Sequence, residues 1–266
     1  MKHSAGRILT THAGSLPRSD TLINLLGTRN RGEPVDSKLF EREAGASTRQ
    51  VIERQCQVGI DIGNNGEQSR VSFSTYVTFR MSGFGGSAER KQPRDRKEYP
   101  GVARPRVVDL RVAPKCTGPV RYERLNEAEK ECHDFLKYLG DSGVHFEETF
   151  MTAASPGIIA LTMQNGYYPT YEDYVFAIAE EMRKEYELIV SKGLLLQLDC
   201  PDLAMERNTS YQDEPLSAFQ DLVRLNIRAI NRAVRNIPRD QVRMHVCWGN
   251  TEAPHHYDVP LADILP

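Results

Sequence analysis

The chain has 266 residues, of which 39% are hydrophobic and 26% are charged, as is usual for a globular domain that buries one substantial core. Its 34 basic and 36 acidic side chains leave a formal net charge of -2, which gives no electrostatic reason to expect nucleic acid or an anionic membrane as a partner. Because no run approaches the ~18 apolar residues of a membrane span, the first residues hold no continuous apolar stretch, and the five cysteines are odd in number and scattered, we expect a cytoplasmic protein with a small-molecule partner.

Short β-like runs alternate along the chain with segments whose apolar residues recur at helical spacing. The predicted strands are residues 7–12, 60–67, 114–122, 148–156, 194–199 and 243–250. The predicted helices are residues 36–58, 126–139, 170–192 and 213–236, with Gly59, Gly140 and Gly193 just past three of the ends. This alternation predicts an α/β fold with a parallel sheet and helices outside it.

Polar clusters follow nearly every predicted strand, with the sequences HAGS, GNNGE, TGP, ASPG, LDCPD and HVCWGN. A (β/α)8 TIM barrel builds its site from the carboxyl ends of several strands, whereas a doubly wound sheet uses one switch point, so the barrel is favoured. Six of the eight strands are predicted, and we expect residues 1–266 to form a single barrel domain that lacks the last two. The open edges of this barrel would pair with another segment or with another chain, for example in a homo-oligomer. Residues 82–106, rich in Gly, Pro and Arg, are predicted to form a long loop over the barrel mouth.

His245 and Cys247 are separated by one residue near the end of the last predicted strand. Alternate residues of a strand face the same side, so the imidazole and the thiol would both point to the barrel interior. Zn²⁺ prefers this combination of nitrogen and sulfur ligands, but it needs three or four protein ligands. The alternative is a hydrogen-bonded interior histidine beside a cysteine that packs as a small hydrophobic residue.

Several motifs, taken in their order along the chain, resemble the cobalamin-independent methionine synthase (methionine synthase II) family, meaning its catalytic barrel domain and short paralogues. They are THAGSLPR (11–18), GIDIGNNGEQSR (59–70), CTGPV (116–120), LQLDCPDLAM (196–205) and HVCWGNTEAPHHYDVPL (245–261). The resemblance implies that His245 and Cys247 bind a catalytic zinc. In the family, a glutamate and a second cysteine from the last two strands complete the site, and this chain ends before both.

The resemblance also implies the chemistry, which is methyl transfer to homocysteine from a 5-methyltetrahydropteroyltriglutamate donor. A thiol is mostly protonated at neutral pH, and coordination to zinc deprotonates it to a nucleophilic thiolate. Two alternatives stay open. Some relatives use coenzyme M as the thiol and open an epoxide, and a truncated paralogue would be noncatalytic.

Glu67 and Asp199 match family carboxylates that hold the amino group of homocysteine, and two carboxylates at a barrel mouth suit an ammonium group. Their alternative role is to cap helices or to pair with local arginines. Gly14 and Ser15 match the first-strand loop that contacts the substrate carboxylate, although they also fit a simple tight turn. His12 lies beside this loop, where its ring could contact substrate, metal or backbone.

This chain departs from the synthases on the fifth predicted strand, where their Asp-Glu-Pro becomes Asp199, Cys200 and Pro201. The segment after Cys247 also differs from theirs. These departures resemble the shorter paralogues, and they leave the thiol acceptor and the methyl donor open.

Overall fold

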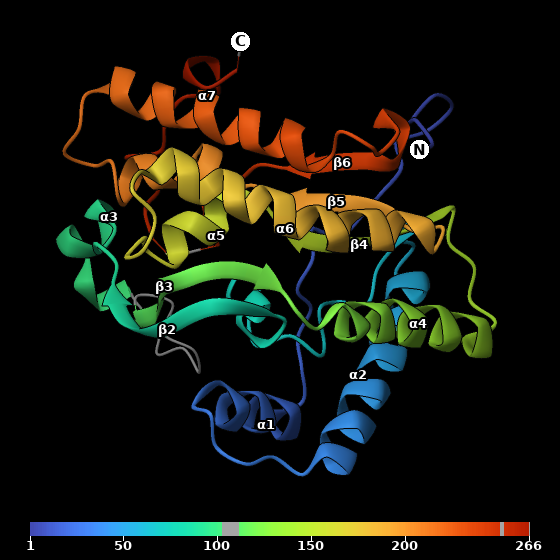
Figure 1. The fold of residues 1–266 in the computed structure, drawn as a ribbon. Helices are drawn as coiled ribbons and strands as arrows, with labels where there is room; N and C mark the ends of the chain where they lie inside the picture. Colours follow the sequence, from blue (N-terminus) through green and yellow to red (C-terminus); the bar gives the residue numbers. More distant parts are fainter. Residues whose placement is uncertain (103–111, 251–252, 266) are drawn as a thin grey trace.

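The computed structural model describes residues 1–102, 112–250 and 253–265 (Figure 1). The α-helices are α1 (Asp20–Asn30), α2 (Ser37–Gln57), α3 (Arg94–Glu98), α4 (Leu125–Ser142), α5 (Pro156–Thr162), α6 (Tyr171–Ser191) and α7 (Leu216–Ala233). The strands are β1 (Ile62–Gly63), β2 (Met81–Glu89), β3 (Val112–Tyr122), β4 (Glu148–Ala154), β5 (Leu195–Asp199) and β6 (Val242–His245). Among these described helices, none combines the length and the apolar character that crossing a membrane requires.

A parallel sheet forms the centre of the fold, in the strand order β1-β4-β5-β6. Thr11 adds a fifth parallel position through a single bridge to Ile62, which is all that remains of the first predicted strand. The predicted α/β fold with a parallel sheet is confirmed. The predicted number of six parallel strands is wrong, because the described residues supply four parallel strands and the single bridge at Thr11.

The third predicted strand, residues 114–122, lies outside the parallel sheet. It forms most of β3, which pairs antiparallel with β2 in a separate two-stranded sheet. Buried and more exposed residues alternate along much of β3, as is typical of an antiparallel strand with one exposed face. The prediction was wrong because a short run of β-forming residues carries no signal for the direction of pairing.

The predicted loop at residues 82–106 is wrong in part. Its first residues belong to strand β2, residues 94–98 form α3, and residues 103–106 lie outside the described part of the chain. Gly83 has a φ of 94°, and a Cβ there would lie 2.7 Å from the backbone oxygen of Pro119 in β3. The glycines of this stretch therefore allow the two strands of the hairpin to approach closely, where composition alone indicated a loop.

The four predicted helices are present, and the ends of two agree with the sequence within one or two residues. Helix α2 starts after Asp36 and helix α6 after Thr170, and each of these side chains accepts a hydrogen bond from a backbone N–H of the first turn. Helix α4 is longer than predicted, since Gly140 lies inside it and Gly143, with a φ of 66°, ends it.

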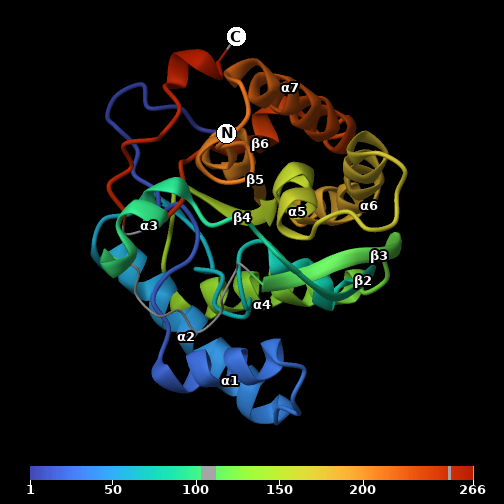
Figure 2. The same cartoon turned by 90° about the vertical axis from the view of Figure 1, so that its left-hand side faces the viewer.

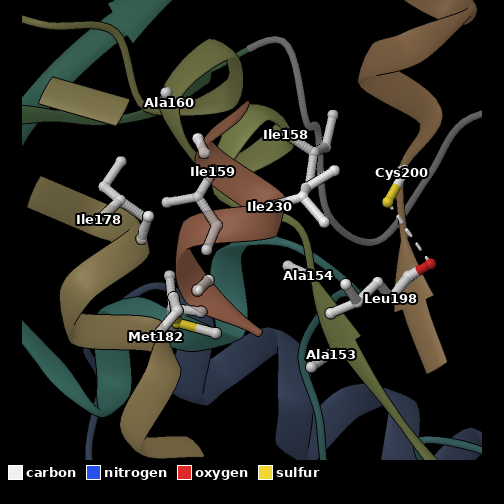
Figure 3. Close-up of a cluster of buried hydrophobic side chains, with 14 of the residues drawn as sticks. Ala153, Ala154, Ile158, Ile159, Ala160, Ile178, Met182, Leu198, Cys200 and Ile230 are labelled. Atoms are coloured by element: carbon white, nitrogen blue, oxygen red, sulfur yellow. Dashed lines mark hydrogen bonds between the residues drawn. The ribbon is translucent and has the colours of Figure 1, made fainter. Parts of the chain in front are cut away.

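Helices α5, α6 and α7 pack together beside strands β4 and β5 (Figures 1 and 2). Figure 3 shows side chains of these elements in one buried cluster: Ala153 and Ala154 from β4, Ile158 and Ile159 from α5, Ile178 and Met182 from α6, Leu198 from β5 and Ile230 from α7. Each fully buried isoleucine contributes roughly 1.5–3 kcal/mol. This packing fixes the strands whose ends carry the candidate site.

The carboxyl ends of three neighbouring strands lie at one level. Ala154 of β4 is in register with Asp199 of β5, and Asp199 is in register with His245 of β6. Side chains in register on parallel neighbours point to the same face of the sheet. The fold therefore brings Asp199 and His245, which are 46 positions apart in sequence, to the same edge and face.

Candidate functional site

The turn after β1 holds Glu67 in an unusual backbone conformation. The side-chain oxygens of Asn64 and Asn65 accept hydrogen bonds from the backbone N–H groups of Gly66 at 2.6 Å and Glu67 at 3.0 Å. Gly66 and Glu67 both have positive φ, 63° and 54°. A left-handed conformation at a non-glycine residue costs on the order of 1–3 kcal/mol and is found mainly at functional sites. The strained turn of the GNNGE motif thus directs the carboxylate of Glu67, which is only 1% exposed, toward the sheet edge.

The segment at residues 12–15 packs directly against Glu67. The hydroxyl of Ser15 donates to Glu67 Oε2 at 2.9 Å. A Cβ at Gly14 would lie 2.8 Å from Glu67 Oε1, so only glycine allows this approach. His12 Nδ1 lies 3.1 Å from the backbone nitrogen of Gly14, which donates to it, so the ring contacts backbone. Three of the predicted substrate-binding residues, Gly14, Ser15 and Glu67, are therefore in one place.

Asp199 lies at the end of β5 and is 6% exposed. The amide nitrogen of Gln197 donates to Asp199 Oδ1 at 2.8 Å and also to the backbone oxygen of Ala13. Burial, followed by the negative charge of Glu67, raises the pKa of Asp199 to about 8. At neutral pH, Asp199 is therefore mostly protonated, and it presents a hydroxyl as well as a carbonyl oxygen beside Glu67.

His245 shares this face with Asp199, since the two residues are in register. Burial, followed by the positive charge of Arg243, lowers the pKa of His245, which favours the neutral imidazole that metals bind. Burial raises the pKa of the Cys247 thiol, and the charge of Asp199 adds to this effect.

The imidazole and the thiol have the donor chemistry of a zinc site, but they make only part of one. Within residues 1–102, 112–250 and 253–265, no group of three or more His, Cys, Asp or Glu side chains is arranged to hold a metal ion. A catalytic zinc uses three protein ligands and leaves one position open. His245 and Cys247 therefore suit zinc in kind and are too few in number.

The sequence analysis missed Arg243, whose side chain lies on the same face of the sheet as the candidate site. Its guanidinium donates to Gln197 Oε1 at 2.8 and 2.6 Å and to Thr11 Oγ1 at 2.8 Å, and it lies 3.8 Å from the ring centroid of Phe150. Its place two residues before His245 on a strand was the available signal, since residues at i and i+2 share a face. This side chain connects β6 to the segment of Thr11 on the other side of the sheet.

The segment predicted to cover the mouth does contact the carboxyl-terminal side of the sheet. Arg90 forms an ion pair with the buried carboxylate of Glu206, which belongs to the short turns after β5. Glu98 of α3 accepts from His256 Nε2 at 3.0 Å, and the ring of Tyr99 meets His256 edge to face. His256 therefore joins α3 to the segment that follows β6.

A cavity of about 670 Å³ lies apart from these residues, between α1, α2 and α4. None of the predicted site residues lines it. Its wall includes Asn65, Arg70 and Glu131, so it backs onto the turn of Glu67 from outside the sheet. It is a separate feature from the site at the strand ends.

No protein-family model matches the chain. Among curated proteins, the methionine synthase of Pyrococcus furiosus is 27% identical over 254 residues, and that of Thermococcus kodakarensis is 23% identical over 254 residues. Each alignment covers 91% of this chain and 62% of the relative, so the chain spans less than two thirds of these proteins. The methionine synthase of Saccharolobus solfataricus is 23% identical over 258 residues, which cover 96% of this chain and 68% of that protein.

Two solved structures have a similar fold at 19% sequence identity. A B12-independent methionine synthase from a Shewanella species, in complex with selenomethionine, gives a TM-score of 0.64 over 91% of this chain and 63% of that one. A putative B12-independent methionine synthase from Listeria monocytogenes gives 0.60 over 92% and 68%. The predicted resemblance to methionine synthases is confirmed, and the structures confirm an α/β fold with a parallel sheet.

Proposed function

We propose that this chain binds an amino-thiol of the homocysteine type and belongs to a zinc-dependent S-methyltransferase, with a methyl donor like 5-methyltetrahydropteroyltriglutamate. One observation carries the proposal. Ser15, Glu67 and Asp199 lie together at one edge of the sheet, and Asp199 shares its face of the sheet with His245, the last residue of β6. The similarity to methionine synthases supports the reaction class.

The two carboxyl groups would hold the amino group of the substrate. Glu67 and Asp199 are both buried, and the raised pKa of Asp199 leaves the pair with less negative charge than two carboxylates would carry. A single ammonium group is the natural complement of such a pair, because it can donate to both side chains. The sulfonate of a coenzyme M thiol would instead meet two carboxyl groups, which speaks against the epoxide-opening alternative.

Ser15 and Gly14 would face the carboxylate of the amino acid. The backbone after Thr11 is not part of a regular strand; the N–H of Gly14 donates to His12, whereas Ala13 and Ser15 on either side are exposed. Exposed N–H groups of this kind bind anions. The ammonium and carboxylate groups of one amino acid would then have separate partners.

His245 and Cys247 would hold the zinc ion, together with ligands from beyond the described residues. When bound, zinc deprotonates a thiol at neutral pH and presents it as a nucleophile. The role of this chain's own residues is to orient the amino-acid end of the substrate, so that its thiol reaches the metal edge of the site. His245 is suited to its part because the neutral imidazole predominates.

The test measures zinc content and zinc-dependent homocysteine binding by calorimetry. We expect Glu67→Gln and Asp199→Ala, which remove the charge of one carboxylate and the acceptor oxygens of the other, to weaken homocysteine binding about tenfold or more, as loss of a hydrogen bond to a charged group does. Asp240→Asn is the control and should have no effect, because Asp240 is exposed and lies just before the start of β6, at the end opposite His245. Cys247→Ser should remove zinc-dependent binding and leave the fold intact.

A second measurement follows methionine formation from homocysteine and methyltetrahydrofolate. Binding without methyl transfer would support a noncatalytic paralogue. A wild-type chain that binds no zinc and is indifferent to homocysteine would refute the proposal. Coenzyme M binding as tight as that of homocysteine would refute the assignment of Glu67 and Asp199.

A further inference from the structure

Both oxygens of the Glu67 carboxylate accept a hydrogen bond from a hydroxyl group. Ser15 Oγ donates to Oε2 at 2.9 Å, and Thr152 Oγ1 of β4 donates to Oε1 at 2.7 Å. Each of these hydroxyls in turn accepts from an arginine, Arg18 for Ser15 and Arg70 for Thr152. We call each arginine–hydroxyl pair a relay. Two series of hydrogen bonds, each running from an arginine through a hydroxyl, therefore end on the carboxylate of Glu67.

The Thr152 relay has fixed hydrogen positions. Arg70 Nη1 donates to Thr152 Oγ1 at 3.0 Å and to the backbone oxygen of Thr152 at 2.9 Å. A guanidinium can only donate, so the single hydroxyl hydrogen of Thr152 is left for Glu67. Arg70 itself is buried, and it donates to Glu131 from Nε and Nη2, both at 2.9 Å. Arg70 therefore forms its direct ion pair with Glu131, and it reaches Glu67 only through the hydroxyl of Thr152.

The Ser15 relay also supports the backbone of Glu67. Arg18 Nη2 lies 3.4 Å from Ser15 Oγ and donates to the backbone oxygen of Glu67 at 2.6 Å. Its Nε donates to the backbone oxygen of Gln68 at 3.3 Å. Arg18 therefore binds two carbonyls of the turn that holds Glu67 at a positive φ, and it orients the hydroxyl that holds the side chain.

A neutral hydroxyl between arginine and carboxylate has a specific consequence for ligand binding. An arginine in direct contact would occupy the carboxylate with a cation and compete with any ligand ammonium group. The hydroxyl orients the carboxylate and uses one acceptor position on each oxygen, and a carboxylate offers about four. The remaining positions of Glu67 stay available to a ligand.

We propose that Thr152 with Arg70, and Ser15 with Arg18, are positioning residues that fix Glu67 for the amino group of the ligand, and so set a preference for amino acids over their deaminated analogues. This inference rests on the proposed function, and it assigns roles to Thr152, Arg70 and Arg18. Neither relay requires the metal, so the preference belongs to this chain's own residues.

The experiment compares two ligands that differ only in the amino group, L-methionine and 4-(methylthio)butanoate, by calorimetry with EDTA present. We expect wild type to prefer methionine. Thr152→Val should reduce that preference about tenfold, which is the effect of one lost hydrogen bond to a charged acceptor. Thr152→Ser keeps the hydroxyl and should retain the preference. Thr162→Val is the matched control, because Thr162 is equally buried and its hydroxyl has no hydrogen-bond partner among the described residues.

The Ser15 relay is tested in the same way with Ser15→Ala and, as control, Ser74→Ala, whose buried hydroxyl also lacks a partner in the described chain. Because both ligands carry the carboxylate, any contact of Ser15 with that group cancels in the ratio. Equal binding of both ligands by wild type, or binding of neither, would refute the amino-group site and the relays with it. A wild-type preference that survives both Thr152→Val and Ser15→Ala would overturn the relays alone.

Discussion

Replacement of Asp199 by Asn should change how the stability of the protein depends on pH. The pKa of Asp199 rises from an ordinary value of 3.8 to about 8 because of burial and the charge of Glu67. The folded state therefore holds a proton on Asp199 that the unfolded state releases above about pH 4. A raised pKa of this kind contributes stability that is fully present below the unfolded pKa and is lost as pH rises through the folded pKa. Asparagine does not titrate, and it lacks this dependence.

The magnitude follows from the two pKa values. A tenfold change in proton affinity corresponds to 1.36 kcal/mol, so the whole shift is about 6 kcal/mol at most. Between pH 5 and pH 8, where the protein can be handled, the loss amounts to about 4 kcal/mol. This is a large part of the roughly 5–15 kcal/mol that stabilises a typical domain. Wild type should therefore lose stability relative to Asp199→Asn over this range.

Urea unfolding at several pH values, followed by circular dichroism with EDTA present, measures the effect. The relevant quantity is the free energy of unfolding of wild type minus that of Asp199→Asn. His245, whose pKa is lowered, shifts stability in the opposite direction with pH, but it does so in both proteins and cancels. Asp240→Asn should follow wild type at every pH. A difference between wild type and Asp199→Asn that stays constant within about 1 kcal/mol from pH 5 to pH 8 would refute the reasoning.

Two further substitutions test the supports of the site by the same unfolding assay. Glu131→Gln removes the charge between the buried guanidinium groups of Arg70 and Arg80, and it should cost about 3–5 kcal/mol because two cations would be left less well compensated; a loss below about 1 kcal/mol, typical of exposed pairs, would contradict this. Gly157→Ala should destabilise the protein although alanine favours helices by about 1 kcal/mol, because a Cβ at position 157 would overlap the buried carboxylate of Asp202. A more stable Gly157→Ala protein would show that this start of α5 is less tightly packed.

Sequence patterns predicted the elements best where local signals agree. Helix α6 follows from apolar spacing, the capping side chain of Thr170 and the glycine at position 193, and all three act within a few residues of the helix ends. The antiparallel hairpin of β2 and β3 was missed because strand direction depends on a partner elsewhere in the chain. The short first strand was over-predicted for the same reason, since Thr11 makes one bridge only.

The candidate site shows the same division between local and distant signals. Glu67 and Asp199 could be named because they match carboxylates of the methionine synthase family, and each also lies in a polar cluster at the end of a predicted strand. The partners that orient Glu67 could not, because Thr152 is an ordinary residue in the middle of an apolar strand, 85 positions away. The alternative that Glu67 pairs directly with a local arginine does not hold for Arg70, because the structure pairs Arg70 with Glu131, on a helix that no local pattern links to it.

The proposed amino-acid recognition and the proposed metal binding use residues from different parts of the sheet. Ser15, Glu67 and Thr152 come from the segment of Thr11, from the turn after β1 and from β4, and their hydrogen bonds need no residue from β6. His245, by contrast, ends the last strand of the sheet and Cys247 lies two residues beyond it, and no third ligand joins them among the described residues. The two functions are therefore separable: binding of an amino acid should survive removal of zinc, whereas activation of its thiol cannot.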